Sequence, residues 1–222
     1  MKKLLIISLL MALIFISCSK DEKDEPSIQT DYLTINNSSL ALYCNDTITM
    51  SVSSSDALKG YVSNDTTIAT VTATGKVQAV SVGTTTITVS SAGKTANCSV
   101  VVNPKSTLYV EPYLNFGASI ADVKSHVSNT LNNESATSLV YNSTDTDVRG
   151  ILYSFTDGKL TSICVLLANT TATVNESAVF LKERYKYLGL VGSVGCLVDR
   201  KTNVDVFISV DSTLGLNVIY TN

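Results

Sequence analysis

The chain has 222 residues, with 16 Lys and Arg against 19 Asp and Glu, and its formal net charge is −3. Only 16% of the residues are charged, and the basic residues form no cluster, which argues against nucleic acid and anionic membrane surfaces as partners. The length suits one or two domains.

The N-terminal residues 1–17 have the features of an export signal. Lys2 and Lys3 precede an apolar run in which Ser8 is the one polar residue. The run is well short of the ~20 residues that a membrane-spanning helix needs. It leads into Ile16-Ser17-Cys18, which resembles a bacterial lipobox. The resemblance implies cleavage before Cys18 and a lipid on that cysteine, which would be the membrane anchor.

Residues 18–30 are polar and charged and contain Pro26, which predicts a flexible tether. Within them, Ser19-Lys20-Asp21-Glu22 resembles the export tag of Bacteroidetes lipoproteins bound for the outer face of the outer membrane. That resemblance implies a lipid-anchored protein in the outer membrane that faces the cell exterior. Cleavage removes Lys2 and Lys3, so it changes the formal charge from −3 to −5.

Residues 31–103 consist of short stretches in which apolar and polar residues alternate. The first runs from Leu40 to Cys44 and the last from Ala96 to Val102, with similar stretches between them. Period-two alternation buries one face of a strand, and glycine-containing turns separate the stretches. About seven such strands predict a small β-sandwich.

This region resembles the bacterial immunoglobulin-like domain, group 2. Four segments carry the resemblance: Ile68-Ala69-Thr70-Val71, Thr74-Gly75-Lys76-Val77-Gln78-Ala79-Val80, Gly83-Thr84-Thr85-Thr86-Ile87-Thr88-Val89 and Cys98-Ser99-Val100-Val101-Val102. Tyr61-Val62-Ser63 stands where the family usually has a tryptophan–serine pair. The resemblance implies a spacer or adhesive module of a bacterial surface protein, with no shared catalytic residues. Residues 103–106 follow as a linker that contains Pro104.

Residues 107–222 contain an internal repeat at a constant offset of 54 residues, covering about 119–166 and 173–220. Ser119 and Thr173 open the two copies, each with an acid three positions later, which predicts helix N-caps. Helical apolar stripes follow, the second with a C-cap expected at Gly189. About three alternating strands come after each helix.

The fold class predicted for the whole chain is mainly β. An N-terminal immunoglobulin-like β-sandwich is followed by an α+β domain of two α-β-β-β repeats with an antiparallel sheet. Six strands are expected in that sheet, with both helices packed on one face, because neither copy alone can bury its apolar surface.

Four cysteines follow Cys18, two in each half of the chain. An exported chain is able to oxidise them, which makes Cys44–Cys98 and Cys164–Cys196 candidate disulfides. The alternative is that they are small buried hydrophobic residues. With no C-x-x-C motif and no His/Cys cluster, no zinc site is expected.

The sequence contains no catalytic or cofactor motif, so no cofactor is expected. The one histidine, His126, lies on the flank of the first predicted helix and is interpreted as a surface residue. Asp157 and Asp211 are repeat-equivalent, but both lie at predicted hairpin turns, where Asp caps the backbone. A glycosidase, the hydrolase class considered, needs two carboxylates that flank a sugar. The acids considered for this role are Asp145, Asp147, Asp157 and Glu183; a solvated loop or helix face is the alternative for each of those outside the turns.

Aromatic rings suit the apolar faces of sugars, and Tyr109, Tyr113 and Tyr153 are candidates for such contacts, although core packing is the commoner role. Three short segments also resemble the O-glycosylation sequon of Bacteroidetes. Their hydroxyl residues are Thr47, Thr66 and Ser212.

These features predict a non-enzymatic cell-surface lipoprotein. The immunoglobulin-like domain would be a stalk, and residues 107–222 would be a module for adhesion or for glycan or protein capture. One alternative is an accessory or structural subunit of an outer-membrane complex. A weak hydrolase with carboxylate chemistry is the other.

Overall fold

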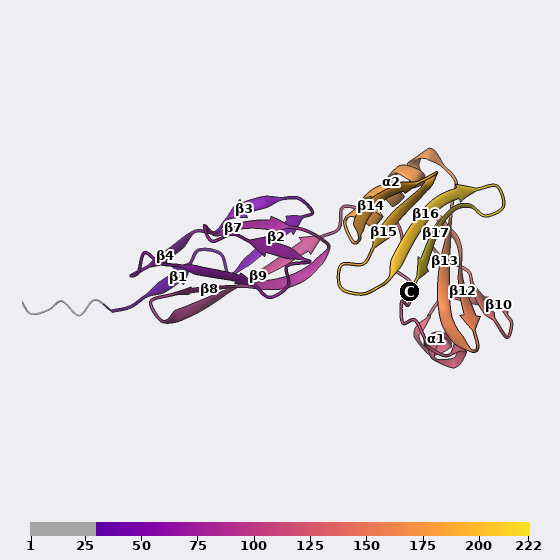
Figure 1. Cartoon of the computed structure of the whole chain (residues 1–222), viewed down its shortest axis with the longest axis horizontal. Coiled ribbons are helices and arrows are strands. Elements are labelled where there is room, and N and C mark those ends of the chain that lie inside the picture. The colour runs from indigo at the N-terminus through magenta and orange to yellow at the C-terminus, as the bar shows by residue number, and fades with distance from the viewer. Residues whose placement is uncertain (1–29) are drawn as a thin grey trace, which may run out of the picture. The chain divides into compact units, whose positions relative to one another are not determined.

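The computed structural model describes residues 30–222 (Figure 1). The predicted export signal, Cys18 and the tether up to residue 29 lie outside the described residues. Asp31–Asn222 form one compact unit, in which the buried apolar residues gather into two hydrophobic cores. One core is built from residues 40–102 and the other from residues 108–220. Neither described helix has the length and apolarity to cross a bilayer.

Nine short strands surround the first core. Two sheets face each other, with strand orders β2-β9-β8-β5 and β3-β7-β6, and β1 pairs with β4. The pairing of β2 with β9 is parallel. The strands are β1 (Leu33–Ile35), β2 (Ser39–Tyr43), β3 (Thr47–Thr49), β4 (Val52–Ser54), β5 (Gly60–Ser63), β6 (Ala69–Val71), β7 (Lys76–Ala79), β8 (Gly83–Ser91) and β9 (Lys94–Asn103).

The core of this sandwich is filled by the apolar side chains of the predicted alternating pattern. Ile87 and Val89 on β8, and Cys98 and Val100 on β9, are fully buried, while the residues between them are less buried. Tyr61 replaces the family's tryptophan and packs against the same core. The Tyr61 ring is one reason why residue 75 is a glycine, because a Cβ at Gly75 would lie 2.9 Å from Tyr61 Cζ. The φ of +77° at Gly75 also disfavours a side chain.

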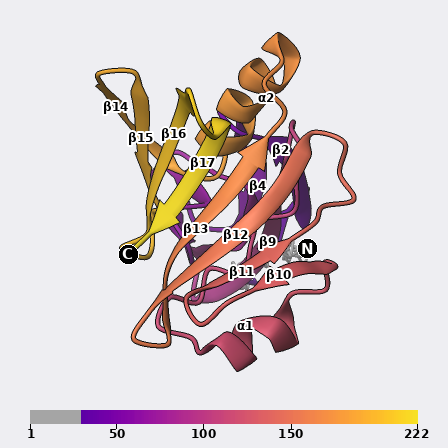
Figure 2. The ribbon, with the colours of Figure 1, turned by 90° about the vertical axis from the view of Figure 1, so that its right-hand side faces the viewer.

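The second core lies under one eight-stranded sheet with two helices. The strand order is β10-β11-β12-β13-β17-β16-β15-β14, and every neighbouring pair is antiparallel (Figure 2). The elements are α1 (Ile120–His126), β10 (Leu131–Glu134), β11 (Ser138–Tyr141), β12 (Val148–Thr156), β13 (Lys159–Leu167), α2 (Thr171–Lys182), β14 (Lys186–Val191), β15 (Val194–Val198), β16 (Asp205–Asp211) and β17 (Gly215–Thr221).

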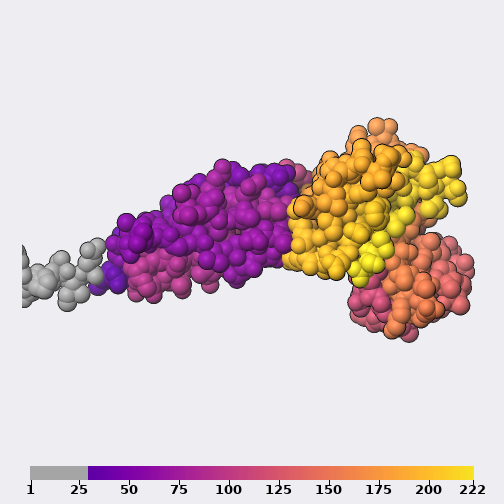
Figure 3. Space-filling view, in the orientation of Figure 1, coloured from indigo at the N-terminus to yellow at the C-terminus, as the bar shows by residue number. Residues whose placement is uncertain are grey.

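The two copies of the repeat meet at the centre of this sheet. On β13 and β17, Cys164 is opposite Ile219, and Val165 is opposite Val218. The repeat makes Cys164 equivalent to Val218 and Val165 equivalent to Ile219. The pair Cys164–Ile219 is therefore equivalent to the pair Val218–Val165. A pseudo-two-fold axis perpendicular to the sheet therefore passes between the pairs. It relates the two halves, whose colours separate them in Figure 3, and it makes β10 and β14 equivalent edges.

Both helices cover the same face of the sheet. Val123 of α1 and Phe180 of α2 are fully buried in one core with Ile163 and Val165 of β13. Cys164 lies between these two strand residues and therefore points to the opposite face. The predicted fold class is thus confirmed: a mainly β chain with a sandwich, an antiparallel sheet and two helices.

Each copy has four strands after its helix, one more than the sequence predicts. The extra strands are β10 and β14, because the apolar stripes that were expected to extend the helices belong partly to strands. α1 ends at His126 and α2 at Lys182. Gly189 is accordingly no helix cap; it lies in β14 at a register shift and has a φ of 130°.

The helix caps agree with the sequence in one copy only. Ser119 caps α1, since its side chain accepts a hydrogen bond from the Asp122 N–H at 3.1 Å. In the second copy the cap is Thr170, which accepts from the Thr173 N–H at 3.1 Å. Thr173 itself is buried in the first turn, so α2 begins about one turn earlier than the repeat predicts.

The four described cysteines are free thiols, which contradicts both candidate disulfides. Cys196 is separated from Cys164 by Phe207 and Ile219 in a row across the sheet, a gap of about 14 Å. Cys44 follows the end of β2 opposite the end of β9, whereas Cys98 lies about 20 Å back along that strand. A disulfide requires Cα atoms within about 7 Å. The alternative of buried small hydrophobic residues holds for Cys44, Cys98 and Cys164, and Cys196 is partly buried.

Candidate functional site

A cavity of about 670 Å³ lies beside α1 in the first copy of the repeat. Its walls are residues 109–114, the end of α1 with residues 126–130, the loop 143–145, and side chains of β12. This cavity is lined by all three tyrosines that the sequence analysis considers as sugar-contacting residues: Tyr109, Tyr113 and Tyr153. We call it the tyrosine cleft.

Tyr113 is held in the tyrosine cleft from four sides. Its N–H donates to the Tyr153 hydroxyl at 3.2 Å, and its own hydroxyl donates to Asp122 Oδ2 at 3.2 Å. The same hydroxyl accepts from Asn115 Nδ2 at 2.9 Å. Its ring stacks on His126, with centroids 4.4 Å apart and planes 6° apart. A partly exposed ring fixed in this way is preorganised to contact a ligand.

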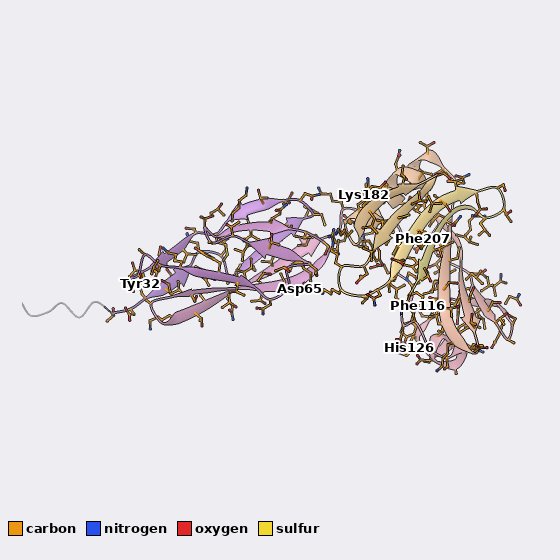
Figure 4. All side chains as sticks on the ribbon, viewed as in Figure 1. Tyr32, Asp65, Phe116, His126, Lys182 and Phe207 are labelled. Atoms are coloured by element: carbon orange, nitrogen blue, oxygen red, sulfur yellow. The ribbon has the colours of Figure 1, made fainter. Side chains whose placement is uncertain are left out.

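His126 is on the exposed end of α1 (Figure 4), as the sequence predicts. Its Nδ1 lies 2.9 Å from the Asp122 carbonyl oxygen, 3.1 Å from Ser125 Oγ and 3.5 Å from Asp122 Oδ1. A Ser-His-Asp triad uses both ring nitrogens, so this arrangement, which places all three oxygens at one nitrogen, is not a triad. Among the described residues Nε2 makes no hydrogen bond.

The back of the tyrosine cleft belongs to the hydrophobic core. The Tyr109 and Tyr220 hydroxyls are 2.7 Å apart, and the Tyr109 ring packs on Phe180 with centroids 4.2 Å apart. Burial raises the pKa of Tyr153 and of Tyr220 above the ordinary range for tyrosine, so both hydroxyls are protonated at neutral pH. The inner wall is therefore neutral and firmly packed.

No Lys or Arg lines the tyrosine cleft, and the acids there are Glu111 and Asp145. The Tyr185 hydroxyl donates to Glu111 Oε1, and Arg184 Nε lies 3.6 Å from Glu111 Oε2. Both oxygens of Glu111 are thus engaged by the protein, and Asp145 is exposed in its loop. Hydroxyl and amide side chains supply the remaining polar lining: Ser128, Asn129, Thr130, Ser143 and Thr144.

The other acids that a hydrolase would need lie elsewhere. Asp147 accepts a hydrogen bond from Thr173 Oγ1 at 2.8 Å. The Glu183 carboxylate is buried, not solvated as predicted, and accepts from the Lys105 and Ser106 N–H groups at 2.9 and 3.0 Å. Asp157 has a φ of 51° in its turn. Of the four acids considered for hydrolysis, the tyrosine cleft contains Asp145 alone.

Asp211 has the turn-capping role that the sequence predicts. Its Oδ1 accepts from the Thr213 and Leu214 N–H groups at 2.7 and 2.5 Å, and its Oδ2 accepts from Asn217 Nδ2 at 3.1 Å. These hydrogen bonds, led by the one from Leu214, lower the pKa of the Asp211 carboxyl.

Within residues 30–222, no three or more His, Cys, Asp or Glu side chains lie close enough together to hold a metal ion. Thr47, Thr66 and Ser212 are all exposed, so they are accessible, and their O-glycosylation stays a prediction.

The sequence gives weak signals for the rest of the tyrosine cleft. Asp122 and His126 are four residues apart, which places them on one face of α1. Sequence reasoning misses that this face meets Tyr113 and Asn115, because the contact depends on how residues 104–118 pack beside the helix.

Comparison with known proteins finds one family. Residues 36–102 match the bacterial Ig-like domain (group 2). The match lies within the region where the sequence shows the same resemblance. It covers less than half of the chain and ends before the first residue of the tyrosine cleft.

Among solved structures, an intimin mutant of EHEC O157:H7 aligns with 85% of this chain and 98% of its own, at 14% identity and a TM-score of 0.29. A score this low carries no argument about fold or function. No curated protein matches the chain.

Proposed function

We propose that this chain is a non-enzymatic cell-surface lipoprotein whose tyrosine cleft captures a neutral saccharide. The observation that carries the proposal is Tyr113, a partly exposed ring stacked on His126 and fixed by Tyr153, Asp122 and Asn115. Sugars bind to aromatic faces through their C–H groups, and to hydroxyl and amide side chains through their hydroxyls. The tyrosine cleft provides both.

The charge of the tyrosine cleft supports neutral sugars over acidic ones. Glu111 and Asp145 line it, and no Lys or Arg does. A sulfated or sialylated glycan would meet like charges there, which costs affinity. Because both Glu111 oxygens are engaged by Tyr185 and Arg184, we favour binding over carboxylate catalysis.

In this proposal residues 36–102 are a spacer and Cys18 carries a lipid in the outer membrane. The match to the bacterial Ig-like family supports the spacer, and the lipobox resemblance supports the anchor. Metabolic labelling with a fatty acid should mark the wild-type chain and not Cys18→Ser. Protease treatment of intact cells should remove the saccharide-binding half; a chain cut only after lysis would place it inside the envelope and contradict the proposal.

The binding test uses the full chain and a panel of neutral oligosaccharides, with sulfated and sialylated ones alongside. We expect saturable binding of a neutral sugar, weakened about tenfold or more by Tyr113→Ala, since a stacking ring is lost. Tyr187→Ala is the matched control, because Tyr187 is also exposed but lies on β14. Equal loss in both variants, or selective binding of sulfated glycans, would contradict saccharide capture in the tyrosine cleft.

A further inference from the structure

The second copy of the repeat ends the sheet with an exposed apolar strand. β14 is an edge strand, paired with β15 on one side only. Leu188, Leu190 and Val191 are 59%, 68% and 72% exposed on it. An edge strand presents unpaired N–H and C=O groups to solvent, and large exposed apolar side chains beside them mark an interaction surface.

The first copy shows that the sheet does not need an apolar edge. β10 occupies the equivalent place, and the repeat offset aligns its last residue, Glu134, with Leu188. Glu134 Oε2 forms an ion pair with Lys124 Nζ at 2.7 Å. Charged residues on an edge discourage strand pairing. One fold thus carries a protected edge and an unprotected one at symmetric positions.

A groove beside β14 fits the side chains of an added strand. It has a volume of about 260 Å³ and lies between α2 and the face of the sheet formed by β14 and its neighbours β15, β16 and β17. Tyr187 and Leu190 line it from β14, and Val174 and Ala178 line it from α2. When a peptide pairs with a sheet edge, its main chain gives affinity and every second side chain enters the neighbouring pocket.

The charges beside the groove indicate what the added strand carries. Lys182 lines the groove, with its Nζ 5.1 Å from the Tyr187 ring centroid, and Lys186 begins β14. Neither lysine is in an ion pair within the described residues. Residues 186–198 contain no acid. A second copy's β14 would therefore bring more lysine and no carboxylate, whereas an acidic partner segment would complement both lysines.

We propose that β14 is a strand-addition site, at which an extended segment of a partner protein with alternating apolar residues and an acidic residue joins the sheet. The segment's apolar side chains enter the groove between β14 and α2, and its acid faces Lys182 or Lys186. The proposal does not rest on saccharide binding. It gives the accessory-subunit interpretation a defined surface.

The probe is a phage-displayed library of random short peptides, selected on the full chain. We expect enriched peptides with alternating apolar positions and an acid. Leu190→Lys should weaken their binding about tenfold or more, measured by fluorescence anisotropy, because the apolar contact between Leu190 and the bound peptide is lost. Asn133→Lys, on β10, the edge strand of the first copy, should leave binding unchanged. Both positions are exposed, and circular dichroism should show that both variants fold.

Backbone chemistry separates strand addition from general apolar binding. Peptides N-methylated at alternate residues should lose binding in one of the two registers, because they lose the hydrogen bonds to β14. Undiminished binding of both methylated forms would overturn the proposal, as would equal enrichment on wild type and Leu190→Lys. Light scattering that shows a dimer dissociated by Leu190→Lys would assign the edge to a second copy and also overturn it.

Discussion

The buried hydroxyl pair of Tyr109 and Tyr220 tests how the tyrosine cleft is built. The two oxygens are 2.7 Å apart, and the side chains are 5% and 0% exposed. No other hydrogen bond of either hydroxyl is found within the described residues. The pair ties the start of residues 109–114 to β17, so it supports the back wall of the tyrosine cleft from the centre of the sheet.

Removing both hydroxyls should cost less than the two single removals added together. Tyr220→Phe leaves the Tyr109 hydroxyl buried without a partner, which costs about 1–3 kcal/mol of unfolding free energy. Tyr109→Phe should cost a similar amount for the same reason. The double variant leaves no unsatisfied group and should cost less than the sum of the two, with a coupling of about 1–2 kcal/mol.

The assay is urea unfolding followed by circular dichroism and by tyrosine fluorescence, which no tryptophan obscures. Tyr32→Phe is the control, since Tyr32 is 47% exposed and its variant should stay within about 0.5 kcal/mol of wild type. Single variants that each cost under about 0.5 kcal/mol, or a strictly additive double variant, would refute the buried pair.

Three further predictions concern helices, pH and thiols. Ser119→Ala should lower the unfolding free energy by about 1 kcal/mol through loss of the α1 cap, and an unchanged urea midpoint would contradict that role. Burial raises the pKa of the Cys164 thiol to about 11 from 9.0, so the folded state holds this proton longer. The stability that this thiol contributes is complete below about pH 9 and is lost as pH rises towards about 11. Melting temperatures should therefore fall over this range, and should fall less in Cys164→Ala. An equal fall in both proteins would contradict a role for the Cys164 thiol. Alkylation of the unfolded, unreduced chain should label every described cysteine, and a missing label would reveal a disulfide; these residues are Cys44, Cys98, Cys164 and Cys196.

The sandwich could be predicted because its sequence signals are local. Alternation along 96–102 fixes which side chains of β9 are buried, and residues such as Gly75 mark the turns. The repeat likewise predicts two equivalent helix-and-sheet units. Its equivalence of Cys164 with Val218 then agrees with the pairing of β13 and β17 at the centre of the sheet.

The ends of the helices could not be predicted from apolar spacing. Tyr185 and Leu188 continue the helical stripe of α2, yet the helix ends at Lys182 and Leu188 lies in β14. Short apolar runs fit a helix and a strand equally well, and tertiary packing decides between them. For the same reason the sequence does not predict β14, the edge strand at which we propose strand addition.

The tyrosine cleft could be predicted only in parts. Tyr113 and Tyr153 are suggested by residue type, but a residue type does not show which residues come together. The hydrogen bond from the Tyr113 N–H to the Tyr153 hydroxyl joins positions 40 residues apart in the chain. Only the packing of residues 104–118 beside α1 brings them together.

The most direct test of saccharide capture is hydrogen–deuterium exchange of the full chain with and without the neutral oligosaccharide that binds best. The account predicts new protection in residues 109–114, 126–130 and 143–145, the walls of the tyrosine cleft. Tyr113→Ala should lose that protection. Protection confined to residues 36–102 would show that the sugar binds the immunoglobulin-like domain and would contradict the account.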